Sequence, residues 1–157
     1  MFAFEDTLPH WVNRLSFQLR SEAQQAFRAK GIDLTPEEWA ILMVIWSRGP
    51  QRMTELASKT FRDRTTVTRM IDRLVRKGLI ERQSSAEDRR TVLIGVTGAG
   101  AALEPDVMAV IKPLIARATA GLSGEDATRA LAVLRQISAN LEAPVRGGDG
   151  TDAPPAD

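Results

Sequence analysis

Residues 35–97 contain three helix patterns followed by two short strand patterns, and this order limits the folds that the chain can adopt. The first helix pattern starts at Thr35, which a proline and then Glu38 follow at capping-box spacing. It ends before Gly49, and a short helix pattern over residues 53–59 comes next. These signals predict a mainly helical, α+β chain with a small hairpin beside its central helices.

The third helix pattern combines an apolar face with a face of hydroxyl groups and guanidinium groups. Asp63 can cap its start by accepting a hydrogen bond from the backbone amide near Thr66, and Gly78 ends it. The residues expected to be buried are Val67, Met70, Ile71 and Leu74. The outward and flanking positions hold Thr65, Thr66, Thr68, Arg69, Asp72, Arg73 and Arg76. Such a helix suits the major groove of DNA, where every base pair presents a different pattern of donors and acceptors.

Two strand patterns, residues 79–83 and 91–96, enclose a polar loop over residues 84–90. The apolar residues that alternate in the second strand are Val92, Ile94 and Val96. The charged residues at the end of the loop are Asp88, Arg89 and Arg90. An extended loop with arginine fits the narrow minor groove, where negative potential is concentrated. The helices and this hairpin together predict a winged helix–turn–helix.

Positive charge is concentrated in the same region. The net charge of the chain is only +1, whereas residues 52–90 hold eleven Lys/Arg and six Asp/Glu. On charge alone, a solvated surface without a partner explains this block equally well. The order of the elements, with apolar faces turned inward, favours binding to double-stranded DNA.

The composition argues against several other classes of protein. The absence of cysteine excludes disulfides, thiolate metal sites and cysteine nucleophiles, and the single histidine, His10, leaves little for a zinc site or a serine-type triad. No glycine-rich phosphate loop follows a strand. There is neither a run of about 18 apolar residues nor a signal-peptide pattern. We therefore expect a cytoplasmic, nucleoid-associated protein without enzymatic activity, cofactor, metal or membrane partner.

Apolar stripes on the flanking helices predict a homodimer. One stripe runs along residues 7–30, and two more helical stretches follow residue 97. Pro105 and Pro113 are expected to interrupt the first of these stretches, with a kink at Pro113. A monomer would leave the stripes largely uncovered. The expected organisation is an N-terminal dimerisation helix in residues 1–34, a DNA-binding region in 35–97, C-terminal dimerisation helices in 98–143 and a disordered tail in 144–157.

Six short motifs occur in a fixed order between residues 34 and 100. They are WAIL at 39–42, MTELA at 53–57, RTTVTRMIDRL at 64–74, KGLIER at 77–82, DRR at 88–90 and VTGAG at 96–100. Together they resemble the MarR family of bacterial and archaeal transcription factors. The resemblance implies a homodimeric regulator, expected to be a repressor, on a pseudo-palindromic operator. Its recognition helix would enter the major groove and its hairpin loop the adjacent minor groove.

The resemblance also assigns roles to individual positions. On the recognition helix it points to Arg64, Thr65, Thr66, Thr68, Arg69 and Arg73. In the loop, which also holds Arg89, Asp88 would orient Arg90, and Arg90 would enter the minor groove. The chain departs from the family pattern at Val96, which replaces the usual leucine. The glycines at positions 95, 98 and 100 are expected to make the junction after the hairpin more mobile.

MarR-like proteins often release DNA when a small aromatic or phenolic anion binds between the dimerisation region and the DNA-binding lobe. The candidates for such a pocket are His10, Trp11, Arg14, Trp39, Met43 and Trp46. Arg14 or His10 would supply the counter-charge. Tryptophans at helical spacing are, however, core residues more often than ligand walls. The alternative function is a winged-helix module that binds a protein or RNA partner and responds to no ligand.

Overall fold

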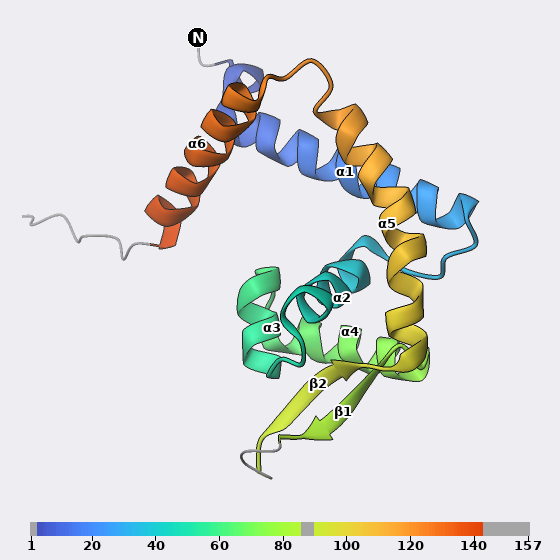
Figure 1. The fold of residues 1–157 in the computed structure, drawn as a ribbon. Helices are drawn as coiled ribbons and strands as arrows, with labels where there is room; N and C mark the ends of the chain where they lie inside the picture. The colour runs from blue at the N-terminus through green and yellow to red at the C-terminus, as the bar shows by residue number, and fades with distance from the viewer. Residues whose placement is uncertain (1–2, 86–89, 143–157) are drawn as a thin grey trace, which may run out of the picture. The chain divides into compact units, whose positions relative to one another are not determined.

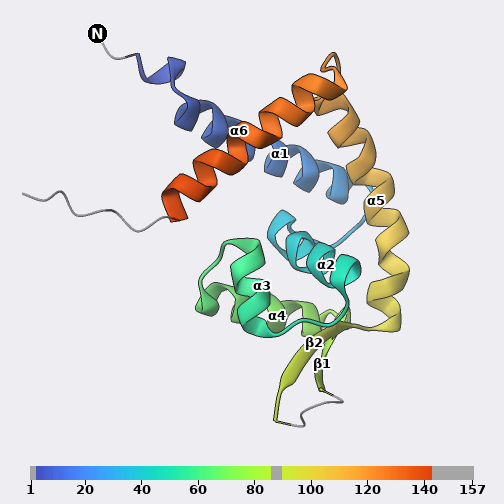
Figure 2. The same ribbon diagram turned by 60° about the vertical axis from the view of Figure 1, so that its left-hand side comes forward.

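The structure is a computed structural model that describes residues 3–85 and 90–142 of the chain. The elements in chain order are η1 (Phe4–Asp6), α1 (Leu8–Ala29), α2 (Pro36–Arg48), α3 (Met53–Thr60), α4 (Arg64–Arg76), β1 (Ile80–Ser84), β2 (Val92–Val96), α5 (Gly98–Ala118) and α6 (Gly124–Glu142) (Figures 1 and 2). The chain divides into two compact units, Met1–Arg117 and Ala118–Asp157. The expected mainly helical fold with one hairpin is confirmed. The predicted tail, residues 144–157, lies outside the described residues.

The helix starts follow the capping signals of the sequence. Thr35 Oγ1 accepts a hydrogen bond from the Glu38 amide at 3.1 Å, and Glu38 Oε2 accepts one from the Thr35 amide at 3.0 Å. Asp63 Oδ1 accepts from the Thr66 amide at 2.9 Å. Both predicted caps are therefore confirmed. Helix α3, for which the sequence suggests no obvious cap, begins after Arg52, whose amide donates to the side chain of Glu55 at 2.8 Å.

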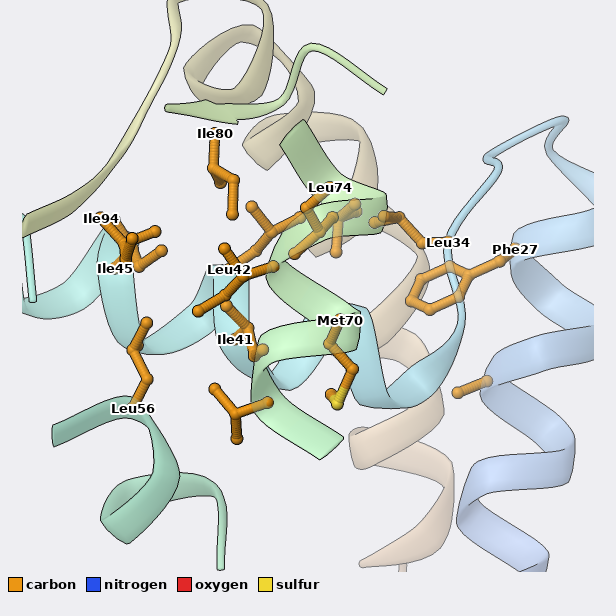
Figure 3. Close-up of a cluster of buried hydrophobic side chains, with 14 of the residues drawn as sticks. Phe27, Leu34, Ile41, Leu42, Ile45, Leu56, Met70, Leu74, Ile80 and Ile94 are labelled. Carbon is orange, nitrogen blue, oxygen red and sulfur yellow. The ribbon is translucent and has the colours of Figure 1, made fainter. Parts of the chain in front are cut away.

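The apolar face of α4 lies at the centre of the core. Its four expected core residues, Val67, Met70, Ile71 and Leu74, are all buried. Figure 3 shows Met70 and Leu74 among side chains from α1, α2, α3 and the hairpin. This burial fixes the rotation of α4 about its axis, because turning the helix would expose the four residues to water.

The hairpin is antiparallel, with a register that runs from Ile80 opposite Val96 to Ser84 opposite Val92. Ile94 is buried, whereas Val92, at the outer end of its strand, is 54% exposed. A contact that the sequence does not predict joins Gln51, between α2 and α3, to Ile94. Two backbone hydrogen bonds of 3.0 and 2.8 Å connect these residues, so the hairpin is held to the α2–α3 connection.

Helix α5 continues through both of its prolines, Pro105 and Pro113, so the predicted interruption is wrong, whereas the kink expected at Pro113 stays a prediction. A proline inside a helix costs about 3 kcal/mol or more, because one hydrogen bond is lost and the ring crowds the preceding turn. Val107, Val110 and Ile111 are buried between the two prolines, and this burial favours the helix locally. In addition, part of the α5 stripe that we expected to be uncovered is packed in the core.

The described segments contain no helix that is both long and apolar enough to span a membrane.

The junction between β2 and α5 is closely packed at Gly100, and the mobility expected there stays a prediction. The amide of Gly100 donates to Thr97 Oγ1 at 3.0 Å, and its carbonyl accepts from the indole of Trp46 at 3.2 Å. A Cβ atom at this position would lie 1.9 Å from the carbonyl oxygen of Leu79. Only glycine allows this approach of two backbone segments.

Gly100→Ala is therefore expected to lower the free energy of unfolding by about 1–3 kcal/mol, because backbone must move to admit the methyl group. Urea unfolding measures this change. Gly98→Ala is the matched control, since no atom lies within 4 Å of a Cβ built at Gly98. Equal losses in the two variants would contradict close packing at Gly100.

Candidate functional site

The outward face of α4 presents arginine and threonine side chains. Arg64, Thr65 and Arg69 are exposed, whereas Thr66 and Thr68 are half-buried. Neither Arg64 nor Arg69 forms an ion pair with a residue in the described segments. The helix thus holds two unpaired guanidinium groups on the side opposite its buried face, with short hydroxyl-bearing side chains between them.

Hydrogen bonds fix two of the threonine hydroxyl groups in the first turns of α4. Thr66 Oγ1 donates to Asp63 Oδ2 at 2.6 Å, and Thr68 Oγ1 donates to the Arg64 carbonyl at 2.8 Å. The hydroxyl and the amide of Thr66 both hold the pKa of Asp63 below its ordinary value of 3.8. Asp63 therefore caps the helix as a carboxylate, and the N-terminal end of α4 is rigidly defined.

The C-terminal end of α4 is attached to α2 through Glu38, a carboxylate that is only 1% exposed. Glu38 Oε2 accepts a hydrogen bond from Lys77 Nζ at 3.0 Å, and Glu38 Oε1 lies 3.8 Å from Arg73 Nε. Lys77 Nζ also donates to the carbonyl of Asp33 at 2.8 Å. Arg73, a sequence candidate for DNA contact, is half-exposed and therefore lies between this buried carboxylate and solvent.

The hairpin is also joined to α4 by a side-chain contact. Arg82 Nη2 of β1 lies 2.6 Å from Asp72 Oδ1 of α4. Arg90 is exposed in the turn just before β2. Asp88 and Arg89 lie outside the described residues, so the expected orientation of Arg90 by Asp88 stays a prediction.

A cavity of about 410 Å³ lies beside the core, lined by residues of α1, α2, α4, α5 and the α3–α4 connection. Most of its lining is apolar, and its charged residues are Arg20, Glu37 and Arg62. Trp39 also lines it, and the indole Nε1 of Trp39 is buried without a hydrogen-bond partner in the described part of the chain. Buried polar groups are normally satisfied. The Trp39 N–H is therefore an unsatisfied donor within the described part of the chain.

The structure does not bring together the six residues that the sequence suggests for a ligand pocket. Only Trp39 lines the cavity. In the first half of α1, Trp11 contacts both other candidates: its ring lies edge-to-face with that of His10, and the Arg14 guanidinium carbon lies 5.5 Å from the centre of a Trp11 ring. The indole of Trp46 instead bonds to the backbone of α5, and Met43 is half-buried on α2 without lining the cavity.

Sequence reasoning missed Arg20, Glu37 and Arg62 as members of one site. They come from α1, from α2 and from the turn before α4, and no spacing pattern connects them. The turn between α3 and α4 brings Arg62 to the cavity. Phe61 adopts a left-handed conformation with φ of 53° and is 80% exposed, while its polar neighbours Thr60 and Arg62 both line the cavity.

Helices α2 to α4, with the hairpin held against them, define a winged helix–turn–helix protein. The sequence profile of the MarR family matches residues 34–92. The winged helix–turn–helix region, residues 34–92, therefore belongs to the MarR family, whose members are transcriptional regulators.

Similarity to individual proteins agrees with this assignment. The chain is 28% identical over 118 residues to the uncharacterized HTH-type transcriptional regulator YkoM of Bacillus subtilis (strain 168), covering 74% of this chain and 77% of YkoM. CouR from Rhodococcus jostii RHA1, solved bound to p-coumaroyl-CoA, has the same fold, with a TM-score of 0.80 and 20% identity over 88% of this chain and 96% of CouR. The DNA binding of Bordetella bronchiseptica BpsR is regulated by 6-hydroxynicotinic acid. Its structure matches with a TM-score of 0.77 and 22% sequence identity, over 88% of this chain and 97% of BpsR.

Proposed function

We propose that this protein is a homodimeric repressor that binds a pseudo-palindromic operator in double-stranded DNA and releases it on binding a small aromatic anion. The observation that carries the proposal is the outward face of α4, where Arg64 and Arg69 are exposed and unpaired within the described segments. The buried residues of α4, the Asp63 cap and the Glu38 contacts hold this face toward solvent. A helix held in this way can enter the major groove without first being ordered.

The DNA contact proposed for each site residue follows from its exposure and its hydrogen bonds. Arg64, Thr65 and Arg69 would meet base edges or phosphates, because all three are exposed. Thr66 and Thr68 would present methyl groups and oxygen lone pairs, since their protons are already donated within α4. The loop residues Asp88, Arg89 and Arg90 would enter the minor groove, and Arg73 would reach a phosphate from beside Glu38.

Dimerisation accounts for apolar surface that the core does not cover. Leu8, Trp11 and Leu15 of α1 are 60%, 49% and 51% exposed, and no residue of α6 is buried. A stripe of this extent marks an interaction surface. Residues 1–34 and 98–143 would supply the dimer, and residues 35–97 the DNA contacts. Two-fold symmetry then places half-sites one helical turn apart, about 34–36 Å.

The cavity supports the ligand response. Its volume of about 410 Å³ falls in the usual range for small-molecule sites. Its apolar lining suits an aromatic ring, and Arg20 and Arg62 supply positive charge for an anionic group. The response of BpsR to 6-hydroxynicotinic acid, in a protein of the same fold, is consistent with a ligand of this class.

The test is a titration of intergenic DNA beside the gene that contains an inverted repeat, followed by gel shift or fluorescence anisotropy. We expect tight binding to the intact repeat, weaker binding to a single half-site, and a slope of log K against log salt of about −0.9 per phosphate contacted. The controls are a scrambled duplex and an RNA duplex of the same sequence.

Two results would contradict the proposal. Equal affinity for the repeat, the scrambled duplex and the RNA would exclude an operator-specific DNA regulator. A protein that sediments as a monomer at micromolar concentration would exclude the dimer. A shallow salt dependence with a protein partner would instead support the alternative of a protein-binding winged-helix module. Repression itself is tested by transcription in vitro from a promoter that overlaps the repeat.

A further inference from the structure

We infer that Glu37 is a built-in competitor for the anionic group of the ligand: it occupies Arg20 and Arg62 in the free protein, and the ligand replaces it there. This inference rests on the ligand response proposed above. It identifies the residues that set which molecules the cavity accepts, and these are residues that the sequence did not suggest.

One carboxylate oxygen is shared between two guanidinium groups in the cavity. Glu37 Oε1 lies 3.7 Å from Arg20 Nη1 and 4.0 Å from Arg62 Nη2. Charge-assisted hydrogen bonds between nitrogen and oxygen are about 2.7–2.9 Å long, so both contacts are long. The cluster has two positive charges and one negative charge in a mostly apolar lining. This cluster therefore favours the binding of a second anion, or of an anion that lies closer to the two arginines than Glu37 does.

Glu37 can leave these contacts at little cost. Its side chain is 34% exposed, as is that of Arg62, and the Arg20 side chain is 52% exposed. Exposed ion pairs contribute about 0–1 kcal/mol, because water and salt screen them. A ligand carboxylate that reaches either arginine in the bidentate geometry would make shorter bonds than Glu37 makes. Glu37 would then turn toward solvent.

The ligand chemistry follows from the rest of the lining. The indole N–H of Trp39 is buried without a partner in the described segments, and its ring packs edge-to-face on Phe27 with centroids 6.2 Å apart. An aromatic carboxylate would place its charge at the arginines and its ring against the apolar lining, to which Trp39 contributes. A neutral aromatic molecule would gain nothing from the removal of Glu37.

The position of Arg62 connects the cavity to the DNA-binding face. Arg62 directly precedes Asp63, the cap of α4, and Arg64 is the first residue of that helix. Glu38, the neighbour of Glu37 on the first turn of α2, holds the opposite end of α4 through Lys77. The first turn of α2 therefore contacts Arg62, just before the recognition helix, and Lys77, just after it. A ligand that binds Arg62 in place of Glu37 changes the contact near the N-terminal end of α4 and leaves the contact between Glu38 and Lys77 in place.

The test compares binding of 4-hydroxybenzoate and its neutral analogue 4-hydroxybenzamide to the full chain by isothermal titration calorimetry. We expect Glu37→Gln to bind 4-hydroxybenzoate about three- to fivefold more tightly than the wild type, because the competing charge is gone while the side-chain shape is kept. Its affinity for the benzamide should stay within about twofold. Arg62→Gln should weaken binding of the benzoate by about tenfold.

Glu22→Gln is the matched control, because Glu22 is also paired with an arginine, Arg117, but does not line the cavity. It should leave the benzoate affinity unchanged. If the wild type binds the benzoate and Glu37→Gln binds it equally or less tightly, the inference is overturned while the ligand response stands. If neither protein binds the benzoate although both bind operator DNA, the ligand response and the inference fail together. Binding by Glu37→Gln alone would support the inference, with Glu37 as a complete block.

Discussion

The double variant Arg64→Ala, Arg69→Ala should bind operator DNA about 100-fold more weakly than the wild type, since a specific arginine contact to a base is worth about 1–3 kcal/mol. Both side chains project from α4 without an ion pair in the described segments, so their loss removes no internal contact. Thermal melting should therefore change little. Fluorescence anisotropy at a fixed salt concentration measures the affinity.

The single variants and the salt slope separate two roles for these arginines. A residue that contacts only phosphate should reduce the salt slope by about one and weaken all sequences equally. A residue that contacts a base should reduce the preference for the repeat over a scrambled duplex. Arg28→Ala is the control, because Arg28 is exposed in the last turn of α1. An unchanged affinity in the double variant would exclude α4 as the recognition helix.

Leu74→Ala should lower the free energy of unfolding by about 2–5 kcal/mol, the range for a buried leucine truncated to alanine. Leu74 is 0% exposed and lies between α2 and the hairpin in the core of Figure 3. Its loss leaves a cavity under the recognition helix. Chemical unfolding at one fixed protein concentration measures the change, since the apparent stability of a dimer depends on concentration.

Val92→Ala serves as the control for this truncation, because Val92 is 54% exposed at the outer end of β2. We expect it to change the free energy of unfolding by less than about 1 kcal/mol. A Leu74→Ala variant as stable as the control would show that the buried face of α4 is not a packing surface.

Sequence patterns predicted those elements whose signals are local. Thr35 and Glu38 form a capping box, and Asp63 caps α4, because a cap depends on residues three positions apart. The buried face of α4 follows from the helical repeat of its apolar residues. Adjacent positions on a helix point apart, and Glu37 and Glu38 accordingly have separate partners in Arg20 and Lys77.

Features that depend on packing between distant segments were not predicted. The bridge between Gln51 and Ile94 involves one residue on one side, which is too short to give an alternating pattern. The two prolines predicted an interruption of α5, because the local cost of a proline is known from sequence whereas the burial of Ile111 is not. The tight approach of Gly100 to Leu79 likewise depends on two segments that meet only in the folded chain.

The same distinction applies to the candidate site: residues that lie close in sequence could be predicted, and residues that packing brings together could not. The arginines and threonines of α4 could be selected from one helical face, since that face is contiguous in sequence. The cavity could not, because Arg20 and Arg62 meet only after α1, α2 and α4 have packed. The tryptophans are candidates for the ligand pocket because of their aromatic side chains alone. In the folded chain, the indole of Trp46 instead donates a hydrogen bond to the carbonyl of Gly100.

The two attachments of the hairpin, Gln51 to Ile94 and Arg82 to Asp72, have a consequence for how operators can vary. They join β1 and β2 to the helices that carry the recognition face, so the described part of the hairpin and α4 keep one separation. For the proposed dimer, we therefore expect differences between acceptable operators to fall in the spacer between the half-sites, because only the contact between the subunits can adjust to it.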